Sequence, residues 1–254
     1  MLKSFAGGRL FGGTWGQERP SVLVLHGWAR THADFDGLFA DRPGSMPSAI
    51  GPDLPGFGAT PPPPEPAGTE WYAEQLLPLF ESGQLADRVV VVGHSFGGKV
   101  GLRLQQMVPG RIDRLVLTGV PLLDRRGRRS RPAFSYRVGR RLHRAGLIGD
   151  ERMEAFRMRF GSSDYRAASG VMRSVLVQVL AEQYADVLPG VVCPVVLLWG
   201  ADDHDVPVEV AERAAEILPQ ARLEVVEGVG HLLPLEAPDA LFHALVGAGE
   251  TASP

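Results

Sequence analysis

Three kinds of side chain in this sequence have the types and spacing of a nucleophilic catalyst. Ser95 lies in the segment Gly93-His-Ser-Phe-Gly97, directly after a run of four valines. A serine hydroxyl is a weak nucleophile at neutral pH, so it needs a base to take its proton and an acid to orient that base. The candidates for the acid and the base follow downstream, as Asp202, Asp203, Asp205 and His231. Together these residues could carry out acyl transfer.

The sequence around Ser95 predicts a sharp corner between a strand and a helix. Val89–Val92 is typical of a strand buried on both faces, and Lys99–Met107 has the composition of a helix. Such a corner forces the serine into a sparsely populated backbone conformation, which only small neighbours tolerate. The Gly-x-Ser-x-Gly pattern, followed by Gly98, therefore indicates a nucleophile elbow. The alternative is a glycine-rich turn without chemistry.

The acid and base candidates are expected at one edge of a sheet. The loop from Gly200 to Pro207 follows a predicted strand at 195–199 and precedes a predicted helix at 208–218. His231 follows another predicted strand, at 223–226. In open α/β folds the sites lie at the carboxyl ends of the strands, where these loops begin.

The remaining pattern predicts the elements that hold this edge. Short strands and turns are expected over 3–16, further strands at 21–25, 48–51 and 114–118, and helices at 31–40, 71–80 and 240–246. Strands separated by helix-length segments need crossover connections. The predicted fold class is therefore α/β, with a mostly parallel twisted sheet and helices on both faces.

One segment interrupts this alternation. Residues 121–186 contain 14 Arg, no Lys and seven Asp or Glu, whereas the rest of the chain carries a net charge of −10. Apolar stripes predict three helices in it, at 134–145, from Asp150 to Phe160, and at 165–184. We therefore expect a core domain of 1–120 and 187–254, with a helical, arginine-rich cap of 121–186 inserted in it. The arginines Arg137, Arg140, Arg141 and Arg144 could attract an anionic ligand, or they could be a solvated surface.

The composition excludes several other classes. The chain of 254 residues is 44% hydrophobic and has a formal net charge of −3, which argues against general nucleic-acid binding. We expect no membrane span, no cleaved leader and a cytoplasmic location. We also expect no cofactor, because no dinucleotide fingerprint is present. Cys193 is the single cysteine and is expected to be a small buried residue, and His204 among aspartates fits a solvated turn better than a metal site.

Five motifs together resemble the α/β-hydrolase superfamily over nearly the whole chain. They are His26-Gly-Trp28, Asp53-Leu-Pro-Gly-Phe-Gly58, Gly93-His-Ser-Phe-Gly97, Gly200-Ala-Asp-Asp203 with Pro207, and Gly230-His231 with Glu236 and Pro238. The resemblance implies a catalytic triad of Ser95, Asp203 and His231, with Asp202 and Asp205 as competitors for the acid. It also implies that the backbone N–H groups of Trp28 and Phe96 form the oxyanion hole. His26 and His94 are expected to be structural.

The motifs and the arginine-bearing cap are also similar to the carboxylesterases that demethylate the pimeloyl-acyl-carrier-protein methyl ester. That similarity implies a small-molecule ester or acyl substrate, either anionic or attached to an acidic carrier protein. Carbon–carbon bond hydrolases and the menaquinone-pathway synthase use a similar triad, so they stay open as alternatives. A triad-bearing receptor or signalling protein with slow turnover is an alternative of another class, as is membrane association through a basic helix at 134–145.

Overall fold

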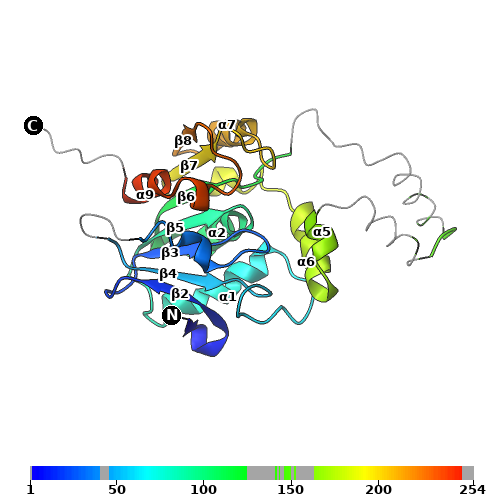
Figure 1. Ribbon diagram of the computed structural model, residues 1–254, viewed down its shortest axis with the longest axis horizontal. Helices are drawn as coiled ribbons and strands as arrows, with labels where there is room; N and C mark the ends of the chain where they lie inside the picture. Colours follow the sequence, from blue (N-terminus) through cyan, green and yellow to red (C-terminus); the bar gives the residue numbers. More distant parts are fainter. Residues whose placement is uncertain are drawn as a thin grey trace, which may run out of the picture.

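The structure, a computed structural model, describes residues 2–40, 46–124, 141, 143, 146–149, 152 and 163–247. The described chain forms an eight-stranded sheet in the order β1-β2-β4-β3-β5-β6-β7-β8 (Figure 1). Its strands are β1 (Lys3–Phe5), β2 (Leu10–Trp15), β3 (Val22–Leu25), β4 (Ala49–Asp53), β5 (Val89–His94), β6 (Ile112–Thr118), β7 (Val195–Gly200) and β8 (Ala221–Val226).

The sheet is parallel apart from its first two strands. Strand β2 pairs antiparallel with both β1 and β4, whereas β4, β3, β5, β6, β7 and β8 pair in parallel. Parallel strands all end at the same edge, so the loops that follow β3, β5, β7 and β8 gather there. The predicted α/β class with a mostly parallel sheet is confirmed.

Helices cover both faces of the sheet. They are α1 (Thr69–Glu81), α2 (Phe96–Met107), α5 (Ser163–Ala167), α6 (Gly170–Ala181), α7 (Val208–Ile217), α8 (Leu233–Glu236) and α9 (Pro238–Val246), with short 3-10 helices η1 (Ala6–Gly8), η2 (His32–Phe35), η3 (Pro109–Arg111) and η4 (Leu188–Gly190). Buried side chains of α1, α2 and α7 belong to one apolar cluster, and those of η2, α8 and α9 belong to another. The sheet separates the two clusters.

The valine run of β5 serves both clusters, as expected for a strand buried on both faces. Val91 packs in the cluster with α1 and α2, and the next residue, Val92, packs in the cluster with α9. Successive side chains of a strand point to opposite faces, so an uninterrupted β-branched run suits a central strand. This places the end of β5, and Ser95 after it, in the middle of the sheet edge.

Two predicted helices differ from the structure. The helix expected at 31–40 is only the 3-10 helix η2 followed by turns, and Gly37 lies where that helix would have continued. The helix expected at 165–184 is divided into α5 and α6, because Ser169 is extended and Gly170 has a φ of 52°. Glycine in a helix interior costs about 1 kcal/mol relative to alanine, so both positions are natural interruptions.

The chain between β6 and β7 is described only in part. The helix expected at 134–145 lies almost entirely outside the described residues, and so do the helix from Asp150 to Phe160 and the arginines Arg137, Arg140 and Arg144. The two α-helices described in this stretch, α5 and α6, lie at one side of the sheet (Figure 1). Among the described helices, none is both long enough and apolar enough to cross a bilayer.

Candidate active site

Ser95 stands at the corner between β5 and α2, as the sequence predicts. Its backbone has φ 48° and ψ −111°, and it is one of three residues other than glycine with positive φ in the described chain. Such a conformation costs on the order of 1–3 kcal/mol and persists only where the surroundings impose it. Strain of this kind is common at catalytic positions, so the observation marks the corner as a candidate site.

The three glycines around Ser95 are required by close packing. A Cβ atom on Gly97 would lie 2.2 Å from the carbonyl oxygen of Leu25, at the end of β3. One on Gly98 would lie 2.2 Å from a methyl carbon of Val120, and one on Gly93 would lie 2.5 Å from the Cα atom of Gly98. The start of α2 therefore sits directly against the neighbouring strand ends, which accounts for the glycine pattern in the sequence.

The acid and base loops bring Asp203 and His231 together. His231 Nδ1 lies 2.8 Å from Asp203 Oδ2. The other carboxylate oxygen of Asp203 accepts the backbone N–H groups of Asp205 and Val206, at 2.9 and 2.7 Å. Asp203 is 3% exposed, whereas Asp202 and Asp205 are exposed. Of the three aspartates, Asp203 is thus the one whose carboxylate is held in place to orient the imidazole.

The imidazole of His231 also packs on the end of β6, next to the serine corner. A Cβ atom on Gly119 would lie 2.9 Å from His231 Cε1. The carbonyl oxygen of Thr118, one residue earlier, accepts the backbone N–H of Ser95 at 2.9 Å. Ser95 is therefore hydrogen-bonded to Thr118 and His231 lies against Gly119, two neighbouring residues at the carboxyl end of β6.

Several charges set the protonation of His231. Burial lowers its pKa, but the hydrogen bond to Asp203 and the negative charges of Asp203, Asp205 and Asp164 raise it, and the net shift is upward. Asp164 belongs to α5, so this helix lies close enough to the site to act on the imidazole. A histidine that prefers the protonated form is a stronger base once it is neutral.

Glu236 holds the loop of His231 from the other side. Its two carboxylate oxygens accept the backbone N–H groups of Gly230 at 2.6 Å and Leu232 at 3.1 Å, the residues on either side of His231. The sequence places Glu236 in a motif with Pro238, but only the structure assigns it this contact. Glu236 lies five positions after His231, and a local sequence pattern does not say from which backbone N–H groups a carboxylate will accept hydrogen bonds.

The side chains of Trp28 and Phe96, whose backbone N–H groups are the candidate oxyanion donors, lie next to each other. The rings of Trp28 and Phe96 meet edge to face with their centroids 5.5 Å apart, and Phe57 lies 5.0 Å from Trp28. Within the part of the chain that the structure describes, no backbone carbonyl outside the regular helices and strands accepts the N–H of Trp28 or of Phe96. Unpaired N–H groups beside a nucleophile are suited to stabilising a developing negative charge.

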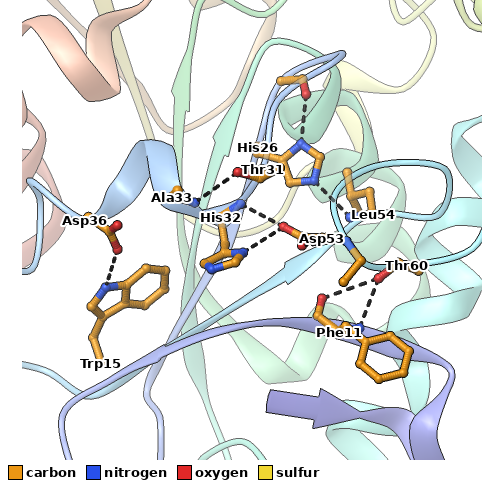
Figure 2. Close-up of polar contacts among 12 residues, drawn as sticks. Phe11, Trp15, His26, Thr31, His32, Ala33, Asp36, Asp53, Leu54 and Thr60 are labelled. Carbon is orange, nitrogen blue, oxygen red and sulfur yellow. Dashed lines mark hydrogen bonds and ion pairs between the residues drawn. The ribbon is translucent and has the colours of Figure 1, made fainter. Parts of the chain in front are cut away.

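His26 and His94 both make buried structural contacts. The Nδ1–H of His94 donates to the carbonyl oxygen of Thr118 at 3.1 Å, and its ring centroid lies 4.9 Å from that of His231. Burial, followed by the nearby charge of His231, lowers the pKa of His94 to about 3. His26 bridges two loops, because its imidazole donates to the carbonyl oxygen of Gly27 and accepts the backbone N–H of Leu54 (Figure 2). Both histidines are therefore neutral at pH 7.

The segment Asp53–Gly58 packs beneath these loops. The carboxylate of Asp53 accepts the backbone N–H and ring Nδ1–H of His32 at 2.9 and 2.8 Å (Figure 2). It also accepts the backbone N–H of Ala59 at 3.2 Å. Gly58 has a φ of 53°, and a Cβ atom there would lie 2.0 Å from Asp53 Oδ2. The acid and the glycine of this motif thus form one compact turn.

The helix α6 is tied to the core by polar contacts. Lys99 Nζ, from α2, donates to the carbonyl oxygen of Val179 at 3.0 Å. Just after α6, Glu182 accepts the backbone N–H and hydroxyl of Thr69 at 2.8 and 2.6 Å. These contacts fix the end of α6 against the first turn of α1 and the helix that follows Ser95.

No metal centre is evident in the described residues, in which no three His, Cys, Asp or Glu side chains are grouped to hold an ion. His204 is exposed on the acid loop. Cys193 is buried and unbridged, and burial raises the pKa of its thiol. It therefore lacks the thiolate character of a catalytic cysteine.

The fold and this strand–serine–helix corner define an α/β hydrolase. The family model described as the alpha/beta hydrolase family matches residues 22–244. The chain belongs to this family and is a hydrolase.

Named relatives agree with this assignment. The chain is 29% identical over 245 residues to the pimeloyl-[acyl-carrier protein] methyl ester esterase of Aromatoleum aromaticum, covering 87% of this chain and 94% of that one. Its fold is similar to that of a thermophilic esterase from Thermogutta terrifontis, with a TM-score of 0.68, 24% identity and coverage of 95% and 94%. An esterase from Exiguobacterium antarcticum gives a TM-score of 0.71 at 20% identity, covering 96% and 97% of the two chains.

Proposed function

We propose that the protein is a serine carboxylesterase in which Ser95 is the nucleophile, His231 the general base and Asp203 the residue that orients it. The observation that carries the proposal is the 2.8 Å contact between His231 and Asp203, at the same strand ends as the strained Ser95. Asp203 accepts the Nδ1–H of His231, which leaves Nε2 unprotonated as the basic atom.

The reaction would proceed in two acyl transfers. The Ser95 hydroxyl oxygen attacks the ester carbonyl carbon while His231 Nε2 takes the hydroxyl proton, and the carbonyl oxygen becomes an oxyanion facing the N–H groups of Trp28 and Phe96. The intermediate then collapses, the C–O bond to the leaving alcohol breaks, and His231 returns the proton to that alcohol. Water, deprotonated by His231, attacks the acyl-enzyme and releases the carboxylic acid.

The substrate we propose is a carboxylic ester that is small or attached to a carrier protein. Support comes from the relative in Aromatoleum aromaticum, whose name gives a carrier-bound methyl ester as its substrate. A second support is the excess of arginine in residues 121–186, since guanidinium groups suit carboxylates and phosphates. The wall beside the donors is aromatic, formed by Trp28, Phe57 and Phe96, and fits an apolar acyl chain.

The direct test measures turnover of p-nitrophenyl esters of increasing acyl length by the purified chain. We expect many turnovers per molecule, and less than about 1% of that rate in Ser95→Ala with an unchanged circular dichroism spectrum. A single slow turnover would favour a receptor or sensor. Activity retained in Ser95→Ala would overturn the assignment of the nucleophile.

The substrate class is tested by pairing a neutral methyl ester with one that ends in a carboxylate, and with the same acid attached to an acyl carrier protein. We expect a higher kcat/KM for the anionic or carrier-bound ester at low salt. This advantage should fall as salt is added, because the screening length shortens from about 10 Å at 0.1 M to about 3 Å at 1 M. Equal kcat/KM for all three would contradict the carrier-bound proposal and leave the esterase proposal standing.

A further inference from the structure

The peptide unit between Gly27 and Trp28 has its carbonyl group fixed by two hydrogen bonds. Its oxygen, that of Gly27, accepts the Nδ1–H of His26 at 2.8 Å and the backbone N–H of Arg30 at 3.3 Å. The N–H of the same peptide unit is that of Trp28, one of the two candidate oxyanion donors. Whatever orients this carbonyl therefore also orients the donor.

The tautomer of His26 is set by a backbone contact. Leu54 donates its N–H to His26 Nε2 at 2.9 Å, so Nε2 must carry a lone pair and the ring proton must lie on Nδ1. His26 is 1% exposed, and burial lowers its pKa, so the ring stays neutral. Figure 2 shows the ring of His26 directed at Leu54. The imidazole acts as a bridge that accepts from one loop and donates to the other.

We propose that His26 is a positioning residue for hydrolysis: it holds and polarises the Gly27–Trp28 peptide so that the Trp28 N–H faces the developing oxyanion. The inference rests on the proposed esterase function. A trans peptide is planar with its C=O and N–H directed oppositely, so fixing the carbonyl aims the N–H the other way. A hydrogen bond to the carbonyl also draws electron density from the nitrogen, which makes the N–H a stronger donor.

The loop needs such a restraint because its backbone is strained. Ala29, directly after Trp28, has a φ of 56°, a conformation that costs free energy in any residue other than glycine. Gly27 packs against His94, with the position of a Cβ atom only 2.8 Å from His94 Cδ2. A peptide between a close contact and a strained residue would relax by rotating, and rotation would turn the Trp28 N–H away.

The anchor at the other end of the bridge is rigid. Leu54 follows Asp53, whose buried carboxylate accepts two N–H groups of His32 (Figure 2) and the backbone N–H of Ala59. Tyr72 donates its hydroxyl to the carbonyl oxygen of Pro55, the residue after Leu54, at 3.1 Å. The imidazole therefore ties the loop that carries Trp28 to the end of β4.

Two substitutions separate the two hydrogen bonds of His26. In His26→Asn the amide nitrogen can replace Nδ1 as donor to Gly27, but nothing reaches the Leu54 N–H. In His26→Gln the longer side chain can accept from Leu54 in place of Nε2, but the donor to Gly27 is lost. Both variants remove the ring that meets Phe57 edge to face at 5.5 Å, so both should lower Tm to a similar extent. The two variants should therefore have similar stability, but only His26→Asn keeps the hydrogen bond to the Gly27 carbonyl.

We expect kcat to fall about 10- to 100-fold in His26→Gln with KM little changed, because the loss affects the transition state and not the bound ester. His26→Asn should keep kcat within a few fold of the wild type. A spectroscopic measurement gives a second readout. Gly27–Trp28 is the only Gly-Trp pair in the sequence, so carbonyl-¹³C glycine and ¹⁵N tryptophan labelling isolates this one peptide.

The ¹⁵N and amide proton shifts of Trp28 should move upfield in His26→Gln and stay near the wild-type position in His26→Asn, since they report polarisation through the carbonyl. Equal kcat losses and equal shifts in the two variants would overturn the inference while leaving the esterase intact. If the wild-type chain fails to turn over any ester, the proposed function is wrong and the inference fails with it.

Discussion

The two halves of the candidate site are built by different means. On the nucleophile side, atoms are placed by steric exclusion: Gly97 touches the end of β3 so closely that no side chain fits, and Ser95 takes up a strained conformation as a result. On the acid–base side, atoms are placed by carboxylates that accept backbone N–H groups. Asp203 holds the start of its own loop, and Glu236 holds the peptides on both sides of His231.

This difference decides how each half can fail. A steric corner has no alternative arrangement, because a larger residue must displace backbone. A loop held by hydrogen bonds can lose one contact at a time. The free-energy cost of each lost bond depends on whether the freed groups can bond to water. We therefore expect substitutions of the close-packed glycines on the nucleophile side to act on folding, and substitutions of the carboxylates on the acid–base side to act on catalysis with the fold kept.

Among the carboxylates on the acid–base side, the largest catalytic loss should come from Asp203→Asn. The amide keeps one oxygen for the N–H groups of Asp205 and Val206 but cannot hold the Nδ1–H of His231 in the same way. We expect kcat to fall by about 10³-fold or more, measured with a p-nitrophenyl ester, and Tm to change little. Asp205→Asn and Asp202→Asn are the matched controls. If either of them is the damaging change and Asp203→Asn is harmless, the acid has been misassigned.

On the nucleophile side, Gly97→Ala should destabilise the fold. Alanine favours helices over glycine by about 1 kcal/mol, so any loss of stability must come from the contact with Leu25 and not from helix propensity. We expect the free energy of unfolding to fall by about 1–3 kcal/mol or more, measured by denaturant titration. Gly110→Ala is the control, since nothing lies within 4 Å of its Cβ position. Equal stability of the two variants would contradict the steric account of the corner.

The same contrast explains what the sequence could predict. Glycines around Ser95 are local, steric requirements, so the strand, the corner and the helix are all readable from neighbouring residues. The strand begins at Val89 and the helix ends at Met107, as the valine run and the composition after it predict, but the strand continues to His94 and the helix begins earlier, at Phe96. The predicted pairing of Asp203 with His231 depended instead on a family resemblance. Nothing local distinguishes Asp203 from Asp202 or Asp205, because the difference is burial.

Longer-range polar contacts were not predictable at all. Neither the bridge from His26 to Leu54 nor the contact from Glu182 to Thr69 has a sequence signal, since each joins segments that are far apart in the sequence and meet only in the folded chain. The broken helix at 165–184 was missed for another reason. Its apolar spacing runs through Ser169 and Gly170, and apolar periodicity is insensitive to one glycine that takes a positive φ.

Glu236→Gln should show a smaller, graded loss on the acid–base side. One oxygen remains as an acceptor, while the amide nitrogen faces an N–H group of Gly230 or Leu232. Because this site is exposed and water can replace the lost contact, we expect kcat/KM to fall about tenfold or less and the pH profile to keep its shape. Glu227→Gln, on the same stretch between β8 and His231, is the control. A loss as large as that of Asp203→Asn would mean that Glu236 does more than hold the loop.

The pH profile reports the charge environment of His231. The base must be neutral, so kcat/KM should rise with pH through a single apparent pKa that lies above 6.5. Because the protonated form is favoured in the folded state, the same group stabilises the fold below its unfolded pKa, and this stability is lost as pH rises through the folded pKa. His231→Ala should remove both the activity and this pH dependence. A midpoint below 6.5 would show that burial outweighs the aspartates.

The smallest expected effect is that of a charge on helix α5 on the pKa of His231. Asp164 is exposed on α5, yet its charge helps to raise the pKa of His231. Asp164→Asn should therefore move the midpoint of the kcat/KM profile downward at low salt, with the maximal rate unchanged. At about 1 M salt the screening length falls to about 3 Å, so the midpoints of the variant and the wild type should coincide. Asp186→Asn removes the same charge farther along the same segment and should leave the midpoint in place.

If both variants shift the profile equally, the effect is one of net charge and α5 does not act on the imidazole. If only Asp164→Asn shifts it, the helix that precedes α6 lies over the base, and the charge at this side of the site is negative even though the surrounding segment is rich in arginine.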